Sequence, residues 1–135
     1  MTGKLLWALA LAAMVLVGCS GGGGSAMVAS EVGDVAAGEE LFRQLVIGEY
    51  IPGCVNCHSV EPGVVLVGPS LAGIGVAAAT RVTGKSAEDY LRESIINPNA
   101  YIAEGFPAGY MYVDYAADLS EEQVNNLVAY MLTLE

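Results

Sequence analysis

The sequence predicts an all-α domain of about three main helices joined by long loops. Residues 35–47, 87–96 and 121–134 carry helical periodicity or a helix-capping signal. The segments between them are rich in glycine and proline and show no extended alternating strand pattern, although residues 64–67 form a short β-branched run. Three helices make a small core for about 100 ordered residues, so such loops need a further apolar partner, such as a large cofactor, to stay ordered.

The first 18 residues are expected to be a secretory signal. Lys4 precedes thirteen apolar residues, 5–17, fewer than the roughly 20 that a membrane-spanning helix needs. The stretch ends in Leu-Val-Gly-Cys, which resembles a bacterial lipobox, in which the cysteine is lipidated and becomes the first residue after cleavage. The alternatives are an ordinary signal peptide with a chance cysteine, or an uncleaved anchor helix running to about residue 24. We expect a lipid on Cys19, which would otherwise be a leftover thiol in an exported protein.

Residues 19–33 are predicted to form a flexible tether, because SGGGGS follows Cys19. A flexible chain of this length has an r.m.s. reach of about 20 Å, which would keep the domain at residues 34–135 close to the membrane. The chain is also acidic, with a formal net charge of −10, and cleavage before Cys19 would remove one basic residue and no acidic one. Such a surface is repelled by nucleic acid and by anionic lipid, so neither is expected as a ligand, and it favours a basic protein partner.

The first helix is expected over residues 35–47. Asp34 is a suitable N-cap, and Gly48 supplies a stop. Small or apolar side chains recur at helical spacing at Gly38, Leu41, Phe42, Leu45 and Val46.

Two further helices carry clearer capping signals. The second, residues 87–96, begins after Ser86 in an S-x-x-D cap and ends before Asn97-Pro98. The third, residues 121–134, begins with the capping box Ser120-Glu-Glu-Gln123. One face of the third helix is apolar at Val124, Leu127, Val128 and Met131.

Residues 53–60, GCVNCHSV, hold two of the three cysteines and the only histidine. A Cys-x-x-Cys-His run is typical of c-type haem attachment, in which the thiols of Cys54 and Cys57 add to the two vinyl groups and His58 reaches the iron. A structural zinc site would need four ligands, and the mature chain has no second cysteine pair or histidine. A thioredoxin-type pair expects a preceding strand in a βαβ unit, and a plain disulfide would leave His58 without a role.

The second face of the iron needs another ligand, because the chain has no second histidine. It takes methionine or another weak ligand, or it stays empty. Met27 lies in the tether, where holding it on iron would cost ordering entropy, and Met131 suits the buried face of the third helix. Met111 lies in the loop GFPAGYMY, whose glycines let the backbone approach a flat ligand. Met111 is therefore the favoured ligand, and the alternative is that it only covers the haem edge.

With these residues in place, residues 34–135 resemble the class I cytochrome c family. GEELF at 38–42 is similar to the G-x-x-x-[FY] motif of that family's first helix, and LVAY at 127–130 to the L-x-x-Y motif of its last helix. The resemblance implies that these helices cross near Gly38 and that one covalently bound haem lies among helices and loops. It also implies, from GPSL at 68–71, that the Pro69 carbonyl receives the imidazole N–H of His58.

A finer resemblance lies in residues 90–98 and 105–111. These are similar to the cytochrome domain fused to subunit II of caa3-type oxidases, and to the monohaem lipoprotein subunit of alternative complex III. No copper-binding domain precedes the haem domain here, which favours the second family. Two features depart from both. Tyr112 stands where proline usually follows the ligand methionine, and about eight extra residues, 46–53, lengthen the path from the first helix to the haem.

We therefore expect a membrane-tethered monohaem cytochrome that transfers one electron at a time. No nucleophile or acid–base pair appears elsewhere, so an electron carrier is expected rather than an enzyme. The resemblance implies a place at the outer, periplasmic face of a bacterial cytoplasmic membrane. It also implies, as partners, a quinol-oxidising respiratory or photosynthetic complex and a soluble carrier or oxidase. A free lipid-anchored shuttle, or a haem sensor or peroxidase with an open iron, is the alternative.

Overall fold

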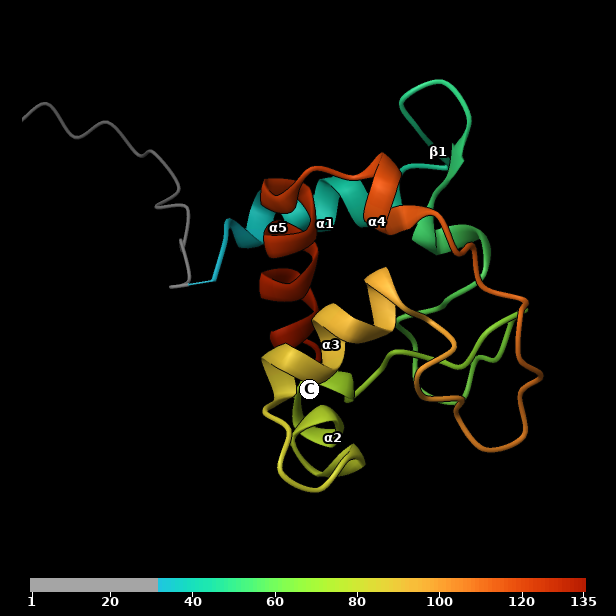
Figure 1. The fold of residues 1–135 in the computed structure, drawn as a ribbon, viewed down its shortest axis with the longest axis vertical. Helices are drawn as coiled ribbons and strands as arrows, with labels where there is room; N and C mark the ends of the chain where they lie inside the picture. The colour runs from blue at the N-terminus through green and yellow to red at the C-terminus, as the bar shows by residue number, and fades with distance from the viewer. Residues whose placement is uncertain (1–31) are drawn as a thin grey trace, which may run out of the picture.

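The computed structural model describes residues 32–135, which form a mostly helical domain with long loops (Figure 1). Cys19, Met27, the predicted signal and residues 19–31 of the predicted tether lie outside the described residues. The predicted end of the tether at residue 33 is wrong, because Val32 packs against the core and a Cβ at Gly33 would lie 2.6 Å from the backbone of Asn125. The helices are α1 (Val35–Arg43), the 3-10 turn η1 (Cys54–Asn56), α2 (Ile74–Arg81), α3 (Ala87–Ile96), α4 (Tyr115–Asp118) and α5 (Glu121–Leu132). Within residues 32–135, none of these helices is long and apolar enough to cross a membrane.

The helix starts follow the capping residues in the sequence. The Asp34 side chain accepts a hydrogen bond from the N–H of Ala37 at 3.0 Å, and Ser86 caps α3 in the same way. At α5, Ser120 and Gln123 form both hydrogen bonds of a capping box. The predicted second helix is confirmed over its whole length, and the third ends two residues earlier than predicted.

The first helix is shorter than predicted, and an unpredicted hairpin follows it. α1 ends at Arg43, because Gln44 has extended backbone angles. Strands β1 (Val46–Ile47) and β2 (Ile51–Pro52) then pair antiparallel, with Gly48 at a φ of +62° in the turn. The hairpin buries Ile47 and Ile51 to 3% and 7% exposure, so core burial outweighs continuation of the helix. Gly48 is therefore a turn residue rather than the helix stop, and the extra residues 46–53 form this projecting hairpin (Figure 1).

Two short helices also went unpredicted. Gly73, the N-cap of α2, has a φ of +72° and offers no side-chain cap, and only Ile74 and Ala78 of this helix are buried. α4 is four residues long and has no side-chain cap hydrogen bond. Neither segment carries the cap or the long apolar stripe that identifies a helix from sequence.

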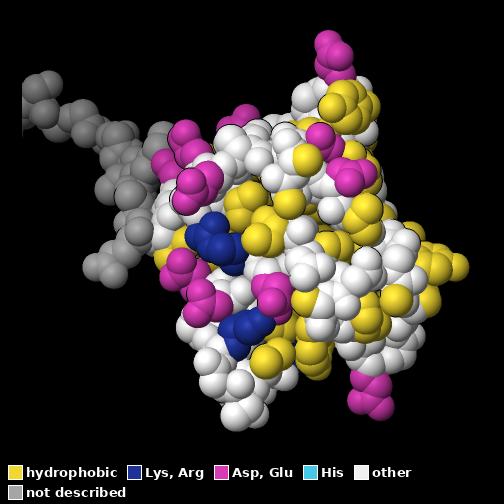
Figure 2. All heavy atoms as spheres, viewed as in Figure 1, with side chains coloured by type: hydrophobic (Ala, Val, Ile, Leu, Met, Phe, Trp, Pro, Cys, Tyr) yellow, Lys and Arg dark blue, Asp and Glu magenta, His cyan; other side chains and the backbone are white. Residues whose placement is uncertain are grey.

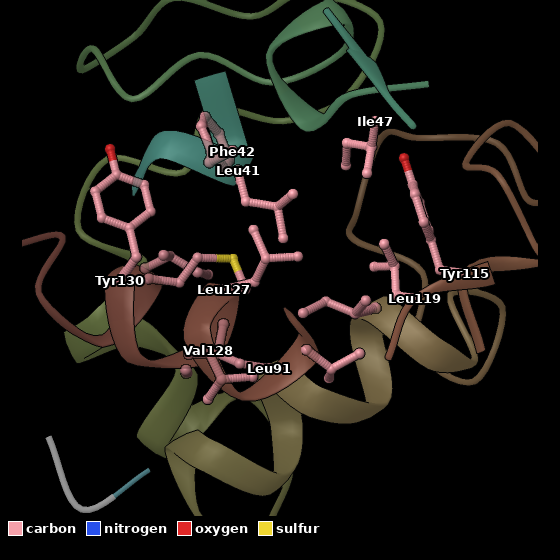
Figure 3. Packing of buried hydrophobic residues seen from close by; sticks show 14 of the residues in the cluster. Leu41, Phe42, Ile47, Leu91, Tyr115, Leu119, Leu127, Val128 and Tyr130 are labelled. Atoms are coloured by element: carbon pink, nitrogen blue, oxygen red, sulfur yellow. The ribbon is translucent and has the colours of Figure 1, made fainter. Parts of the chain in front are cut away.

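The core lies where α1 crosses α5, and α3 packs against both α5 and α2 (Figures 1 and 3). Gly38 sits flush on α5, since a Cβ at this position would lie 1.9 Å from the Asn126 carbonyl oxygen. Beside this contact the rings of Phe42 and Tyr130 are tilted against each other at 5.4 Å between centroids. Leu127 is almost fully buried in the same region (Figure 3). The predicted crossing at the glycine is therefore confirmed.

Candidate functional site

A cavity of about 420 Å³ lies between the helices and the long loops. It is in the range of cofactor and ligand sites in proteins. Most side chains that line the cavity are apolar or aromatic. Arg81 is the one residue with a formal charge at neutral pH among the described residues of the lining. The cavity wall includes every site residue predicted for the domain, namely Cys54, Cys57, His58, Pro69 and Met111. Hydrophobic side chains also gather over the loops in the middle and right of the face in Figure 2.

The turn η1 presents the two cysteines on one side of the cavity. Backbone N–H groups of Cys57 and His58 both donate to the Cys54 carbonyl, at 3.1 and 2.9 Å, so the motif winds tightly. Gly53, the residue before the motif, packs against the backbone of Gln44. Only glycine fits there, because a Cβ would lie 1.6 Å from the Gln44 carbonyl oxygen. The motif is therefore held against the end of α1.

The two thiols are free and are not joined as a disulfide. Burial raises the pKa of the Cys54 thiol to about 11. A catalytic redox cysteine needs the opposite, a lowered pKa that yields thiolate at neutral pH. The Cys54 thiol in this environment therefore lacks the lowered pKa of a thioredoxin-type nucleophile.

His58 is oriented by one hydrogen bond and by one close backbone contact. Its Nδ1 lies 2.9 Å from the Pro69 carbonyl oxygen, and since a carbonyl oxygen only accepts, Nδ1 carries the proton. The ring also packs against Gly68, where a Cβ would lie 2.5 Å from Cε1. Burial lowers the pKa of His58, against a smaller opposite effect of the Pro69 hydrogen bond, and so favours the neutral ring. A neutral imidazole with Nδ1 protonated keeps its Nε2 lone pair free for a metal ion.

Two methionines, Met111 and Met131, line the cavity. Met131 belongs to α5, is 7% exposed and packs in the hydrophobic core, as its place on the apolar face predicts. Met111 lies in the loop between α3 and α4 and packs only partly buried against that core. The sequence did not predict that Met131 also lines the cavity. Leu127, one helical turn earlier on α5, lines the same cavity.

Several tyrosines in the cavity wall were also missed. Tyr90 and Tyr101 meet edge to face at 5.5 Å, and Tyr112 and Tyr115 do so at 5.0 Å. Tyr115 is 5% exposed, and its hydroxyl donates to the Pro52 carbonyl oxygen at 2.6 Å. Burial raises the pKa of Tyr115, so this phenol stays neutral across the physiological range. The aromatic wall thus supplies flat apolar surface, and the hydroxyl groups of Tyr112 and Tyr115 are hydrogen-bonded to the protein.

The donor set suits a large, flat, apolar cofactor that forms covalent bonds to thiols and carries a metal ion. Two free thiols, a neutral imidazole and a thioether share one largely apolar cavity. The Arg81 guanidinium would suit carboxylates at the cofactor's rim. A protein-family model described as Cytochrome c matches residues 35–135, most of the chain. No curated protein matches the chain.

Proposed function

The chain belongs to the cytochrome c family, whose members hold haem c covalently through cysteines and carry electrons, and from this premise we propose how the domain binds its haem. Cys54 and Cys57 form the thioether bonds, and His58 and Met111 ligate the iron from its two faces. One observation carries the proposal: both thiols, the chain's single imidazole and a loop methionine line the same cavity. When bound, the haem iron alternates between ferric and ferrous states, and so accepts and releases one electron at a time.

The protein side of this function is to hold the ligands still and to keep water away. The Pro69 carbonyl fixes the plane and the tautomer of His58 and strengthens its donation to a metal ion. The apolar lining disfavours the more highly charged ferric state, and thioether ligation acts in the same direction, so both raise the reduction potential. With His58 and Met111 both bound to the iron, no metal position would be open for a substrate, which suits an electron carrier.

The experiment for ligation compares Met111→Ala with Met131→Leu, because both side chains line the cavity. Met111→Ala should abolish the thioether-to-iron charge-transfer band of the ferric protein and let the ferrous protein bind carbon monoxide readily. Met131→Leu nearly conserves volume and should leave both properties unchanged. Loss of the band in Met131→Leu alone would assign the ligand to α5 instead. A wild-type protein without the band that binds carbon monoxide would favour a sensor or peroxidase.

We further propose that a lipid on Cys19 tethers the domain to the outer face of the bacterial cytoplasmic membrane. Support comes from the lipobox-like sequence and the Gly/Ser-rich segment that follows it. The wild-type protein should incorporate radiolabelled palmitate, and Cys19→Ser should abolish this labelling. Labelling of Cys19→Ser at the wild-type level, or a wild-type protein without label, would contradict lipid anchoring at Cys19.

The proposed partners are a quinol-oxidising complex of the alternative complex III type as donor and a periplasmic carrier or oxidase as acceptor. The finer resemblance of residues 90–98 and 105–111 supports the donor. The net charge of −10 supports docking to basic partner surfaces. Three of the five basic side chains lie in ion pairs, namely Arg43 with Glu39, Lys85 with Glu93 and Arg92 with Glu88.

Mild detergent extraction followed by gel filtration separates a permanent subunit from a free shuttle. A subunit comigrates with large haem-containing membrane proteins, whereas a shuttle elutes as one small species. Elution as a lone small species under conditions that keep the rest of the complex assembled would contradict the subunit assignment.

A further inference from the structure

The backbone around Met111 has little regular secondary structure. In the described part of the chain, residues 107–113 belong to no helix or strand and form a single turn, at residues 108–109. The Gly109 N–H donates to the side-chain oxygen of Asn99 at 2.8 Å. The position of Met111 therefore depends on side-chain contacts on either side of it, and not on regular secondary structure.

Tyr112 directly follows Met111 and makes the side-chain contacts on the C-terminal side of the methionine. Its hydroxyl donates to Oδ2 of Asp118 at 2.5 Å, a hydrogen bond to a carboxylate, which is stronger than one between neutral groups. Its ring lies edge to face against Tyr115, with 5.0 Å between centroids and an interplanar angle of 74°. Both partners belong to α4 (Tyr115–Asp118), so this short helix holds the phenol of Tyr112 at two points.

The contacts continue from α4 to the cysteine motif. The Tyr115 hydroxyl donates to the carbonyl oxygen of Pro52, two residues before Cys54. Pro52 pairs with Val46 in the hairpin. Side chains of Tyr112 and Tyr115 thus connect the methionine loop to the segment that leads into Cys54.

We propose that Tyr112 is a positioning residue that keeps the Met111 thioether on the iron, and that its hydrogen bond to Asp118 provides this restraint. The inference rests on the proposed function, in which Met111 is the ligand. A proline at position 112 would restrict the loop through its own ring. Here the loop gains its restraint from contacts with α4, so it can be weakened by deleting one hydroxyl group.

The test is displacement of the thioether by imidazole added to the ferric holoprotein. The charge-transfer band reports how much thioether remains bound at each imidazole concentration. Tyr112→Phe and Asp118→Ala should each lower the imidazole concentration for half-displacement about tenfold, the order expected for one hydrogen bond to a partly exposed carboxylate. The double variant should show no further decrease, because both changes remove the same bond.

Tyr110→Phe is the matched control, since it removes a hydroxyl group from the residue on the other side of Met111. Tyr110 is 70% exposed, and its phenol makes no hydrogen bond within residues 32–135. This variant should behave as the wild type. Circular dichroism and thermal unfolding check that each variant is folded, and should Tyr112→Phe fold poorly, Asp118→Ala tests the same bond with both rings intact.

The possible outcomes distinguish failure of the proposed role of Tyr112 from failure of the proposed ligation by Met111. Unchanged half-displacement in Tyr112→Phe and Asp118→Ala, with the band present in the wild type, overturns the role of Tyr112 and leaves Met111 as the ligand. Equal decreases in these variants and in Tyr110→Phe, additive decreases in the double variant, or lower thermal stability without easier displacement also overturn it. A wild-type protein that lacks the band overturns the ligation by Met111 and with it the role of Tyr112.

Discussion

Replacement of Gly68 by alanine probes how closely the protein encloses its histidine. An added Cβ would lie 2.5 Å from Cε1, 2.8 Å from Nδ1 and 3.1 Å from Nε2 of His58. Ordinary contact begins near 3.4 Å, so the ring would have to move by about 0.9 Å. The ring is not free to move by this amount, because Nδ1 donates to the Pro69 carbonyl oxygen and, in the proposed ligation, Nε2 is bound to iron.

The cost of Gly68→Ala follows from these contacts. Overpacking costs about 1–3 kcal/mol, and loss of the 2.9 Å hydrogen bond adds about 1 kcal/mol. Alanine recovers roughly 0.4–1 kcal/mol by restricting the unfolded chain. We expect the free energy of unfolding to fall by about 2 kcal/mol, which lowers Tm by about 10 °C for a domain of this size. The weakened imidazole donation should also raise the reduction potential.

The assay is thermal unfolding of the ferric holoprotein together with a redox titration. Pro69→Ala is the control, because the acceptor is a backbone carbonyl that this change retains. Pro69→Ala should cost less than about 1 kcal/mol and leave the potential nearly unchanged. The reasoning is refuted if Gly68→Ala unfolds at the wild-type temperature with the wild-type potential, or if Pro69→Ala shifts the potential as much.

Two further predictions concern the helix crossing and the methionine loop. Gly38→Ala places a Cβ 1.9 Å from the Asn126 carbonyl oxygen, so denaturation should show a loss of about 2 kcal/mol despite better helix propensity. Ala36→Gly, at an exposed position of α1, calibrates that propensity at about 1 kcal/mol, and an unchanged Gly38→Ala protein would contradict the crossing. The hydrogen bond to Asp118 raises the pKa of Tyr112 to about 12, so its contribution to stability is complete below about pH 10 and disappears as the pH rises through about 12. Asp118→Ala should lower this ionisation toward pH 10 in ultraviolet titration, with Tyr112→Phe identifying the step, and an unmoved midpoint would contradict the hydrogen bond.

The parts of the fold that local sequence determines were predicted well. Ser86 and Ser120 have their capping partners three residues away, so the starts of α3 and α5 follow from short-range chemistry. The end of α1 was wrong because Val46 continues the helical spacing, while its pairing with Pro52 depends on a turn and on burial against the rest of the domain. A short-range sequence pattern does not show whether strand pairing and burial will outweigh continuation of the helix.

The same distinction holds for the candidate site. Cys54, Cys57 and His58 are adjacent, and the chain has one histidine, so the motif alone identified the cofactor. The approach of Met131 to the cavity depends on how α5 is rotated, and the bond from Tyr112 to Asp118 depends on how a loop meets a short helix. Both are tertiary relations between residues that no spacing rule connects.

In the proposed function, His58 and Met111 would both bind the haem iron. A redox-titrated visible spectrum of the purified full-length protein tests it most directly. This ligation predicts a single one-electron transition, a thioether-to-iron band that disappears on reduction, and a ferrous spectrum that carbon monoxide leaves almost unchanged. A ferric protein without that band, together with a ferrous spectrum that shifts on adding carbon monoxide, would contradict it.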